Sequence, residues 1–373
     1  MEQHWNRREW LGAAASLACT GTGRPLADDE RRLAELFRDA HQKHGLAALI
    51  AGVWRQDEKV LTVALGESMT GVPATEAMHY RAGGVGYICI GIALLRFAER
   101  GSLRLDDPVS RWFPKLPQAE TVTLRMLANC TAGDPDYVKA QAFLDAVLKN
   151  PFRQWRAQEL IDFGLATPLH YKPGAGWNYS HTNYTILGEV LQQVAGKPIG
   201  QVLDQEISKP LGLKETENPT TAELRSPALH AFSTDRGIYE DCTYWNPSWA
   251  HPATMTSTLH DLGVLARALG NDQLLSEKSR KELRAPTTVG LGPLRKDFYY
   301  GLGLAVLNGW LAQNPSINGY GSLFAHLPAK KLSVVITSTL GPKSPPNVAY
   351  SSLVFKEVAK LLAPDVPLPE TFK

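Results

Sequence analysis

Residues 80–87, Tyr-Arg-Ala-Gly-Gly-Val-Gly-Tyr, and the apolar run that follows them to Arg100 decide the fold of this chain. From residue 88 to residue 98 almost every position is apolar on all sides of a helical wheel, so a helix here must be buried all round. The run is shorter than the roughly 20 residues that cross a bilayer, which predicts a central core helix and no transmembrane span. The glycines at its start either leave room for a ligand near free helix N–H groups, which favour anionic or polarised groups, or only permit close packing.

The composition is that of a globular protein. The 373 residues are 44% hydrophobic and 20% charged, with a formal net charge of +2, and this length suffices for one large domain or two. No run of Lys or Arg forms a basic arm, which excludes nucleic acid as a partner. No set of His residues has zinc-protease spacing and no Cys-x-x-Cys pair occurs, so we expect no metal and no cofactor, and we expect a monomer.

The N-terminal segment, residues 1–27, resembles a twin-arginine export signal. Arg7-Arg8 precedes a modest apolar stretch, and the chain then changes abruptly to acidic residues at positions 28–30. We therefore expect an exported protein, periplasmic or extracellular. Residues 16–19 also faintly resemble a lipoprotein cleavage site, which would anchor the chain to a membrane through a lipid on Cys19. The alternative is a cytosolic N-terminal helix.

Periodicity divides residues 28–373 into two parts. Strand-like patterns occur near both ends, a long helical region lies between them, and amphipathic helices begin at residue 28 or 29 and at about residue 348. This predicts an α/β (α+β) fold with an antiparallel sheet flanked by helices, built from residues 28–83 and 255–373, plus a mostly helical part at 84–254. The expected strands are residues 46–54, 59–66, 299–307, 320–326 and 332–338.

Short motifs follow one another in a fixed order along nearly the whole of the chain after residue 28. They are residues 80–83 (Tyr-Arg-Ala-Gly), 103–109 (Leu-Arg-Leu-Asp-Asp-Pro-Val), 127–133 (Leu-Ala-Asn-Cys-Thr-Ala-Gly), 173–174, 179–184, 210–213, 256–262 and 300–304. None is specific alone, but their order and spacing together resemble the serine β-lactamases of the class C type and the DD-peptidases and esterases that share their fold. The resemblance implies a β-lactamase/transpeptidase-like fold.

The first motif that this family's chemistry needs is Ser-x-x-Lys at the start of the central helix. One helical turn there sets the ammonium beside the nucleophilic hydroxyl. The matching positions are Gly84 and Tyr87, and no Ser-x-x-Lys, Thr-x-x-Lys or Cys-x-x-Lys replaces them elsewhere. Removing the serine of a serine hydrolase typically costs on the order of a millionfold in rate. The resemblance therefore implies that no acyl-enzyme forms.

The second and third motifs are altered as well. The family's Tyr-x-Asn stands here as Tyr179-Ser180-His181, so that His181 is either a general base or ligand in the cleft or a hydrogen-bonded filler for the lost amide. The third motif, Lys or His, then a small residue, then Gly, falls on Gln313-Asn314-Pro315 when counted back from residues 319–322. Proline cannot donate a backbone hydrogen bond on a strand edge.

These positions predict a retained ligand cleft lined by Gly84, Tyr87, Tyr179, His181 and Gln313. We expect a non-catalytic homologue that binds a peptidoglycan peptide or another small molecule. The alternative is a serine-independent hydrolase of the same fold that acts on an ester or amide through water activated by Tyr179 or His181, and a third reading is a structural interaction protein. Four further aromatic residues either add a wall to the cleft or belong to the core: Trp177, Tyr244, Trp245 and Trp249.

Overall fold

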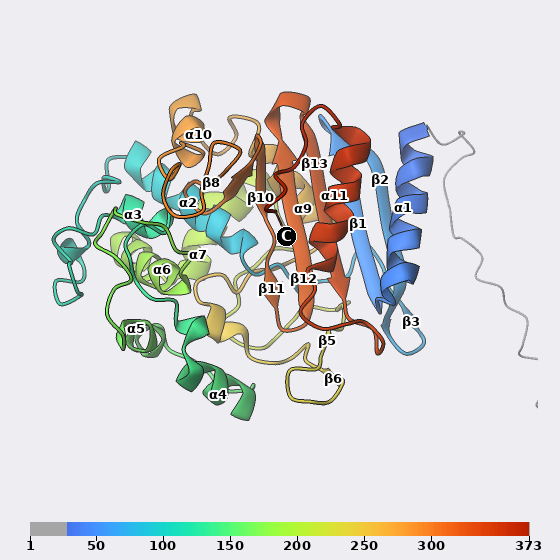
Figure 1. The fold of residues 1–373 in the computed structure, drawn as a ribbon, viewed down its shortest axis with the longest axis horizontal. Coiled ribbons are helices and arrows are strands. Elements are labelled where there is room, and N and C mark those ends of the chain that lie inside the picture. Colours follow the sequence, from blue (N-terminus) through green and yellow to red (C-terminus); the bar gives the residue numbers. More distant parts are fainter. Residues whose placement is uncertain (1–27, 373) are drawn as a thin grey trace, which may run out of the picture.

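A large sheet forms the frame of the protein (Figure 1). The computed structural model describes residues 28–372, so the expected export signal and Cys19 lie outside the described residues. In this part of the chain nine strands pair antiparallel in the order β3-β2-β1-β13-β12-β10-β9-β8, with β11 paired to β12. Their bounds are β1 (Ala48–Arg55), β2 (Glu58–Met69), β3 (Val72–Pro73), β8 (Phe298–Tyr300), β9 (Ala305–Leu307), β10 (Trp310–Gln313), β11 (Ser316–Ile317), β12 (Tyr320–Leu327) and β13 (Leu332–Thr339).

Helices supply the rest of the architecture, together with two short strand pairs. The α-helices are α1 (Asp28–His44), α2 (Val85–Glu99), α3 (Leu124–Ala128), α4 (Gln141–Lys149), α5 (Ala157–Leu165), α6 (His181–Ala195), α7 (Ile199–Leu203), α8 (Lys209–Leu211), α9 (Leu259–Ala268), α10 (Glu277–Leu283) and α11 (Tyr350–Leu362). The short pairs are β4 (Tyr80–Arg81) with β7 (Thr256–Ser257), and β5 (Phe232–Ser233) with β6 (Glu240–Asp241). An antiparallel sheet flanked by helices confirms the predicted fold class.

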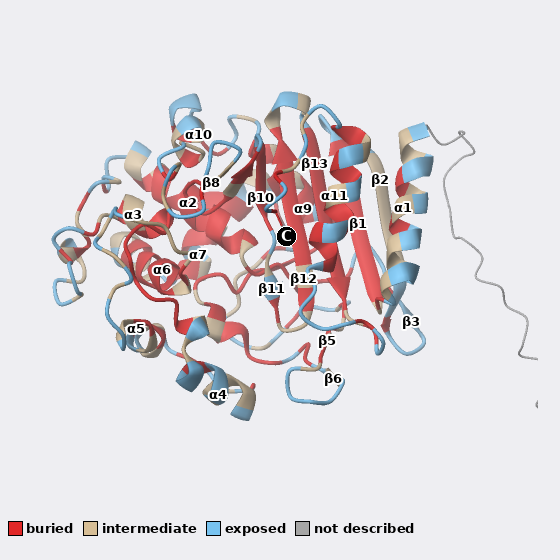
Figure 2. Ribbon diagram, in the orientation of Figure 1, coloured by how far each residue is buried: buried red, intermediate tan, exposed pale blue. Residues whose placement is uncertain are grey.

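Both faces of the sheet are covered. The helices α1 and α11 pack on one face through apolar residues such as Phe37 and Phe355, and α9 packs against β1, β12 and β13 on the other. In consequence residues 48–54 of β1 are all buried, as Figure 2 shows, because a strand covered on both faces has no solvated side. The predicted hairpin is confirmed, with Leu49 opposite Leu65.

The central helix is confirmed as a core element. Residues 85–95 of α2 are all buried, as the apolar pattern on every side of the wheel predicts. The helix ends at Glu99, and Gly101 follows in the left-handed conformation (φ +73°) that suits a glycine after a helix. Its N-terminus points toward the end of β10, which places the glycine-rich start of α2 beside the strands.

One strand prediction was wrong. Residues 299–307 do not form a single strand, because the chain reverses direction at residues 301–304 and β8 pairs with β9 as an antiparallel hairpin, with Tyr300 opposite Ala305. The turn of this hairpin packs against α2. A Cβ on Gly303 (φ +90°) would lie 2.2 Å from the carbonyl oxygen of Tyr87, and a Cβ on Gly91 would lie 2.0 Å from that of Leu302. Glycine at both positions permits this close approach of two backbones, which a pattern of alternating residues does not reveal.

The division of the chain at residues 83/84 and 254/255 stays a prediction. The sheet does draw its strands from both ends of the described chain, and the regular elements within residues 84–254 are helices apart from β5 and β6. No helix within residues 28–372 is long and apolar enough to cross a membrane.

Candidate functional site

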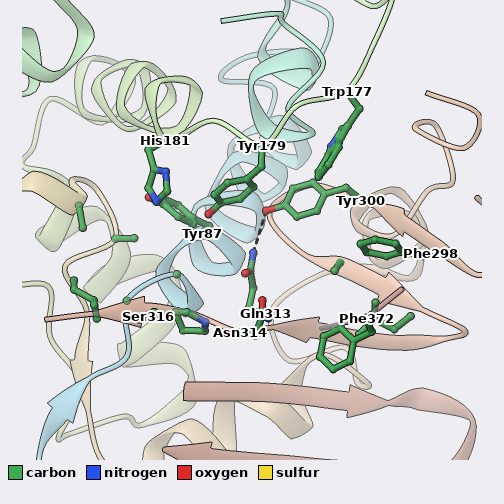
Figure 3. Close-up of a pocket in the computed structure, with 18 of the residues that line it drawn as sticks. Tyr87, Trp177, Tyr179, His181, Phe298, Tyr300, Gln313, Asn314, Ser316 and Phe372 are labelled. Carbon is green, nitrogen blue, oxygen red and sulfur yellow. Dashed lines mark hydrogen bonds between the residues drawn. The ribbon is translucent and has the colours of Figure 1, made fainter. Parts of the chain in front are cut away.

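A cleft with a volume of about 360 Å³ lies where the first residues of α2 and α6 face the end of β10. Its lining includes Gly84, Tyr87, Tyr179, His181 and Gln313, so the residues singled out from the sequence come together although they span most of the chain. Figure 3 shows their side chains converging on one space from the helical part and from the strands.

The start of α2 presents backbone but no reactive side chain to the cleft. Gly84 is the residue before the first helical turn, with φ −59° and no side-chain cap. Three of the N–H groups expected to be free from the sequence are paired, because the amides of Val85, Gly86 and Tyr87 donate to the carbonyl oxygens three residues earlier at 2.9–3.2 Å. Such paired N–H groups attract an anion less than open ones do.

Tyr87 stands one turn into α2, where the resemblance places an ammonium. Its ring stacks on that of Tyr184, with centroids 4.1 Å apart and planes at 29°, and the residue is 2% exposed. The hydroxyl has no hydrogen-bond partner within the described chain. Burial, with the nearby Tyr137 and Asp136, raises the pKa of this phenol well above its usual value, so it is a poor general base.

A second group of aromatic rings forms the wall next to Tyr87. Tyr179 meets Tyr300 almost edge to face at 6.0 Å, and Trp177 lies 5.7 Å from Tyr300, as seen side by side in Figure 3. Burial raises the pKa values of Tyr179 and Tyr300 well above the usual value. The wall is therefore neutral, and it offers π faces and phenol oxygens to a ligand.

His181, the first residue of α6, is held by a buried carboxylate. Its Nδ1 lies 3.0 and 3.2 Å from the two oxygens of Asp136, whose side chain is 1% exposed. The same carboxylate accepts from the backbone N–H of His181 at 3.1 Å and stands in for a helix cap. Because a carboxylate only accepts, Nδ1 carries the proton, and Nε2 of the neutral ring is an acceptor.

Gln313 forms the end of the cleft at the last residue of β10. Its Nε2 donates to the Tyr300 hydroxyl at 3.0 Å and to the Gly303 carbonyl oxygen at 2.8 Å. A carbonyl can only accept, so this network fixes the orientation of the amide. The amide oxygen Oε1 is directed toward the start of α2, 3.7 Å from the position that a Cβ on Gly84 would occupy.

The two residues after Gln313 connect β10 to β11 alongside β12. Asn314 is exposed and donates through Nδ2 to Ser352 at 3.3 Å. Pro315 accepts a backbone hydrogen bond from Ser322 at 2.9 Å, and its Cβ lies 3.4 Å from the Cβ position of Gly84. The proline ring therefore faces the helix start from the side where the family motif carries a glycine.

Of the four aromatic residues that the sequence assigned to either the cleft or the core, two line the cleft and two do not. Trp177 and Trp249 line the cleft, whereas Trp245 belongs to the hydrophobic core and Tyr244 is 46% exposed elsewhere on the surface. Sequence reasoning missed other lining residues and the partner of His181: Tyr300, Phe298, Phe372 and Asp136. Asp136 is 45 positions from His181, and no local pattern connects the two.

The described part of the chain offers little for other chemistry. No group of three or more His, Cys, Asp or Glu residues there is arranged to hold a metal ion. Cys89, Cys130 and Cys242 are free and buried, and burial raises the pKa of the Cys89 thiol to about 12, which leaves an unreactive thiol. Among the described lining residues no Lys or Cys occurs, and the aliphatic hydroxyls are those of the exposed Ser316 and Thr371.

Comparison with known proteins places this geometry in a family. The Beta-lactamase family model matches residues 33–356. The chain is 28% identical over 218 residues to Esterase EstB of Burkholderia gladioli, covering 54% of this chain and 55% of that protein. It is 26% identical over 256 residues to Penicillin-binding protein 4* of Bacillus subtilis (strain 168), covering 62% and 51%. The chain thus spans about half the length of these curated relatives.

Solved structures resemble the chain over most of its length. A D-stereospecific amidohydrolase from Streptomyces sp. has a TM-score of 0.78 at 26% identity, covering 91% of this chain and 99% of that one. The octameric penicillin-binding protein homologue from Pyrococcus abyssi, at 19% identity, shares the fold with a TM-score of 0.75, covering 92% and 78%; the monomeric state expected from the sequence stays a prediction. With its fold, its cleft and a family model that spans most of its residues, this chain belongs to the beta-lactamase family, whose relatives here include esterases, penicillin-binding proteins and amidases.

Proposed function

We propose that this chain is an exported, non-catalytic member of the beta-lactamase family whose cleft binds a small ligand, such as a peptidoglycan peptide. The observation that carries the proposal is the start of α2, where Gly84 has no side chain and Tyr87 is buried against Tyr184. A covalent hydrolase needs a nucleophile with a base beside it. A phenol whose pKa burial has raised cannot take over the part of an ammonium or its conjugate base.

The remaining cleft supports binding. It keeps a volume of about 360 Å³, which is within the usual range of roughly 300–1,000 Å³ for small-molecule sites. Aromatic rings make up much of the lining, and a few polar groups at fixed positions, those of His181 and Gln313, supply orientation. This combination of an apolar wall with convergent polar groups is typical of a ligand site.

Two measurements test the proposal. Incubation with a fluorescent penicillin and a fluorophosphonate should give no covalent adduct by intact-protein mass spectrometry, and a stoichiometric adduct would overturn the non-catalytic assignment. Muropeptides should raise the melting temperature of the wild-type protein but not that of Gly84→Trp, whose indole fills the cleft. The control is Tyr244→Trp, because Tyr244 is 46% exposed and lies outside the cleft lining. The absence of a shift with any muropeptide would favour the structural reading instead.

Export has its own test. If the N-terminal segment is a signal, cells that express the full chain should deliver a mature form lacking about the first 27 residues to the exported fraction. Replacing Arg7-Arg8 with Lys-Lys should retain the precursor in the cytoplasm. Full-length protein found only in the cytoplasm of the wild type would refute export.

One observation favours a second function, hydrolysis without a serine. Asp136 holds His181 so that Nε2 is the acceptor nitrogen, which is the arrangement of a general base. In this scheme Nε2 takes a proton from water, the hydroxide oxygen bonds to the carbonyl carbon of an ester, and the carbon–oxygen bond to the leaving alcohol breaks. The proton on Nε2 then passes to that alkoxide.

This second function separates from binding by its kinetics. Turnover of 4-nitrophenyl acetate should fall to the uncatalysed rate in buffer in His181→Ala. Asp136→Asn should lower kcat while the histidine remains, because an amide NH₂ facing Nδ1 would favour the tautomer with the proton on Nε2. Tyr244→Leu, at an exposed position outside the cleft, should leave turnover unchanged. Equal rates for the wild type and His181→Ala would exclude the hydrolase.

A further inference from the structure

We infer that the cleft selects a ligand with a cationic ammonium group attached to an aromatic or apolar body. The inference rests on the proposed binding function and names the chemical class of the ligand. It starts from the charge of the lining: among the described residues around the cleft there is no Lys, Arg, Asp or Glu. A carboxylate that enters this space finds no cation to pair with, and its desolvation goes uncompensated.

The backbone does not replace the missing cation. The N–H groups of Val85, Gly86 and Tyr87 are paired with carbonyl oxygens, and Pro315 opposite has no N–H to offer. Helix starts bind anions through several open N–H groups. These three N–H groups are therefore not open to an anionic ligand.

Gln313 contributes an acceptor instead. Both hydrogens of its Nε2 are used, one toward Tyr300 and one toward Gly303. Oε1 therefore cannot exchange places with Nε2 without breaking both hydrogen bonds, and it stays directed toward the space beside Gly84. A fixed amide oxygen next to an unfilled position is suited to an N–H donor of the ligand.

His181 adds a second acceptor with a negative charge behind it. The neutral ring turns Nε2 outward when Nδ1 donates to Asp136, and no hydrogen bond of Nε2 to the described chain competes for it. The Asp136 carboxylate has a nearly fully buried side chain, so its field is screened less than that of a surface charge. The polar end of the cleft is thus electronegative.

The aromatic wall fits the same ligand. Tyr87, Tyr179 and Tyr300 meet at steep angles, 69° and 78° between neighbouring planes, with centroids 6.3 and 6.0 Å apart. Rings arranged in this way present faces from more than one direction, and ring faces attract an ammonium group within about 6 Å. Phe298 and Phe372 lie toward the other end of the cleft in Figure 3 and offer an apolar surface to the body of the ligand.

Three small probes of one shape test the charge preference. Benzylammonium, benzyl alcohol and benzoate should be titrated into the full chain at pH 7.5 by isothermal calorimetry. We expect benzylammonium to bind roughly tenfold or more tightly than benzyl alcohol, given the usual strength of desolvated cation–π and charge-assisted contacts, and benzoate to bind weakest. Benzoate or benzyl alcohol binding as tightly as benzylammonium, or no saturation with any probe, would overturn the inference.

Variants test the two predicted contacts of the ligand, the hydrogen bond to Gln313 and the cation–π contact with the tyrosine wall. Gln313→Met should weaken benzylammonium severalfold and benzyltrimethylammonium little, because the quaternary cation has no N–H to donate to Oε1. Tyr179→Leu should weaken both cations, whereas Tyr244→Leu, an exposed aromatic outside the cleft, should weaken neither. Unfolding midpoints verify that each variant is folded, and equal affinity of both cations for Gln313→Met and wild type would remove Gln313 from the site.

The outcomes also separate this inference from the proposed function. If muropeptides shift the melting temperature of the wild type and not of Gly84→Trp, while no cation binds, the binding cleft stands and the charge preference falls. If neither muropeptides nor cations bind, both fall together.

Discussion

Two helices begin at the cleft, and they begin in opposite ways. At the start of α2, Gly84 has no side chain, the following N–H groups are paired with nearby carbonyl oxygens, and the phenol ring of Tyr87 stacks on Tyr184 in the core. The first residue of α6, His181, instead has both its backbone N–H and its ring Nδ1 bonded to Asp136, so that its other ring nitrogen is left as an acceptor. The start of α2 therefore contributes mainly packing contacts, and the start of α6 contributes polar groups that can contact a ligand.

The difference teaches which of the two helix starts is constrained by packing and which by polar contacts. Burial of α2 is needed by the whole core, so its glycines and apolar residues are constrained by packing whatever the cleft does. Packing does not account for the Asp136–His181 pair in the same way, because burying a carboxylate costs free energy unless its hydrogen-bond partners compensate it. Predictions that separate these two helix starts test this contrast.

The largest effect is expected for Asp136→Ala. The change leaves the N–H of His181, the N–H of Val138 and Nδ1 of His181 without their acceptor. Each buried donor left unpaired costs about 1–3 kcal/mol, so we expect a loss of about 4 kcal/mol in the free energy of unfolding, measured by urea denaturation. The matched control is Asp134→Ala, a buried carboxyl two positions earlier with no hydrogen bond to the described chain, which should cost less than about 1 kcal/mol. Equal losses would contradict the assigned role of Asp136.

The next effect is expected at Tyr87. Tyr87→Lys places an ammonium in a site that is 2% exposed, where the nearby Asp136 carboxylate is already bonded to His181, and it removes the stacking on Tyr184. We expect a loss of about 3 kcal/mol in urea denaturation. Tyr87→Phe serves as the control and should be nearly neutral, because the hydroxyl that it deletes has no partner in the described chain. A well-folded, fully stable Tyr87→Lys protein would show that the helix start still tolerates the family's ammonium.

The sequence predicts α2 well because its signal is local. An unbroken apolar run followed by a glycine specifies a buried helix and its end without knowledge of the partners. The strand pattern at residues 299–307 failed because the chain reverses direction at residues 301–304, between the paired strands β8 and β9. A period of two describes which residues alternate and does not mark a reversal, which Gly301 and Gly303 indicate locally.

The cleft was predictable only in part, because some of its contacts join residues that no local pattern connects. Gly84, Tyr87, Tyr179 and His181 could be proposed because motifs with fixed spacing precede or contain them, and Gln313 was found by counting back from a turn. Asp136 sits on a 3₁₀ turn and reaches His181 across 45 positions, so its role depends on tertiary packing alone.

A smaller effect concerns the pH dependence of stability. Burial raises the pKa of Asp134 to about 6 from 3.8, so the folded state binds this proton more tightly than the unfolded state. The loss of folding free energy caused by burying the ionised Asp134 carboxylate is therefore absent below about pH 3.8 and complete above about pH 6. Asp134→Asn should be more stable than the wild type by about 2 kcal/mol at pH 8 and equal to it near pH 4. His326, whose pKa burial lowers to about 4, titrates in the same window, but it is common to both proteins and cancels in the difference. A difference that does not change with pH would refute the raised pKa.

The smallest effect is expected from restoring the serine itself. A Cβ on Gly84 meets only ordinary contacts, 3.4 Å from Pro315 and 3.5 Å from Tyr87, and serine suits a helix N-cap, so Gly84→Ser should change stability by less than about 1 kcal/mol. The new hydroxyl has no ammonium beside it, because the side chain one turn on is the buried Tyr87, and the conjugate base of a phenol with a raised pKa is scarce at neutral pH. Mass spectrometry should therefore find no fluorophosphonate adduct on Gly84→Ser. A stoichiometric adduct there would mean that the polar groups at the start of α6 can activate a nucleophile at the start of α2. The two helix starts would then differ in chemistry only through the absence of a hydroxyl at residue 84.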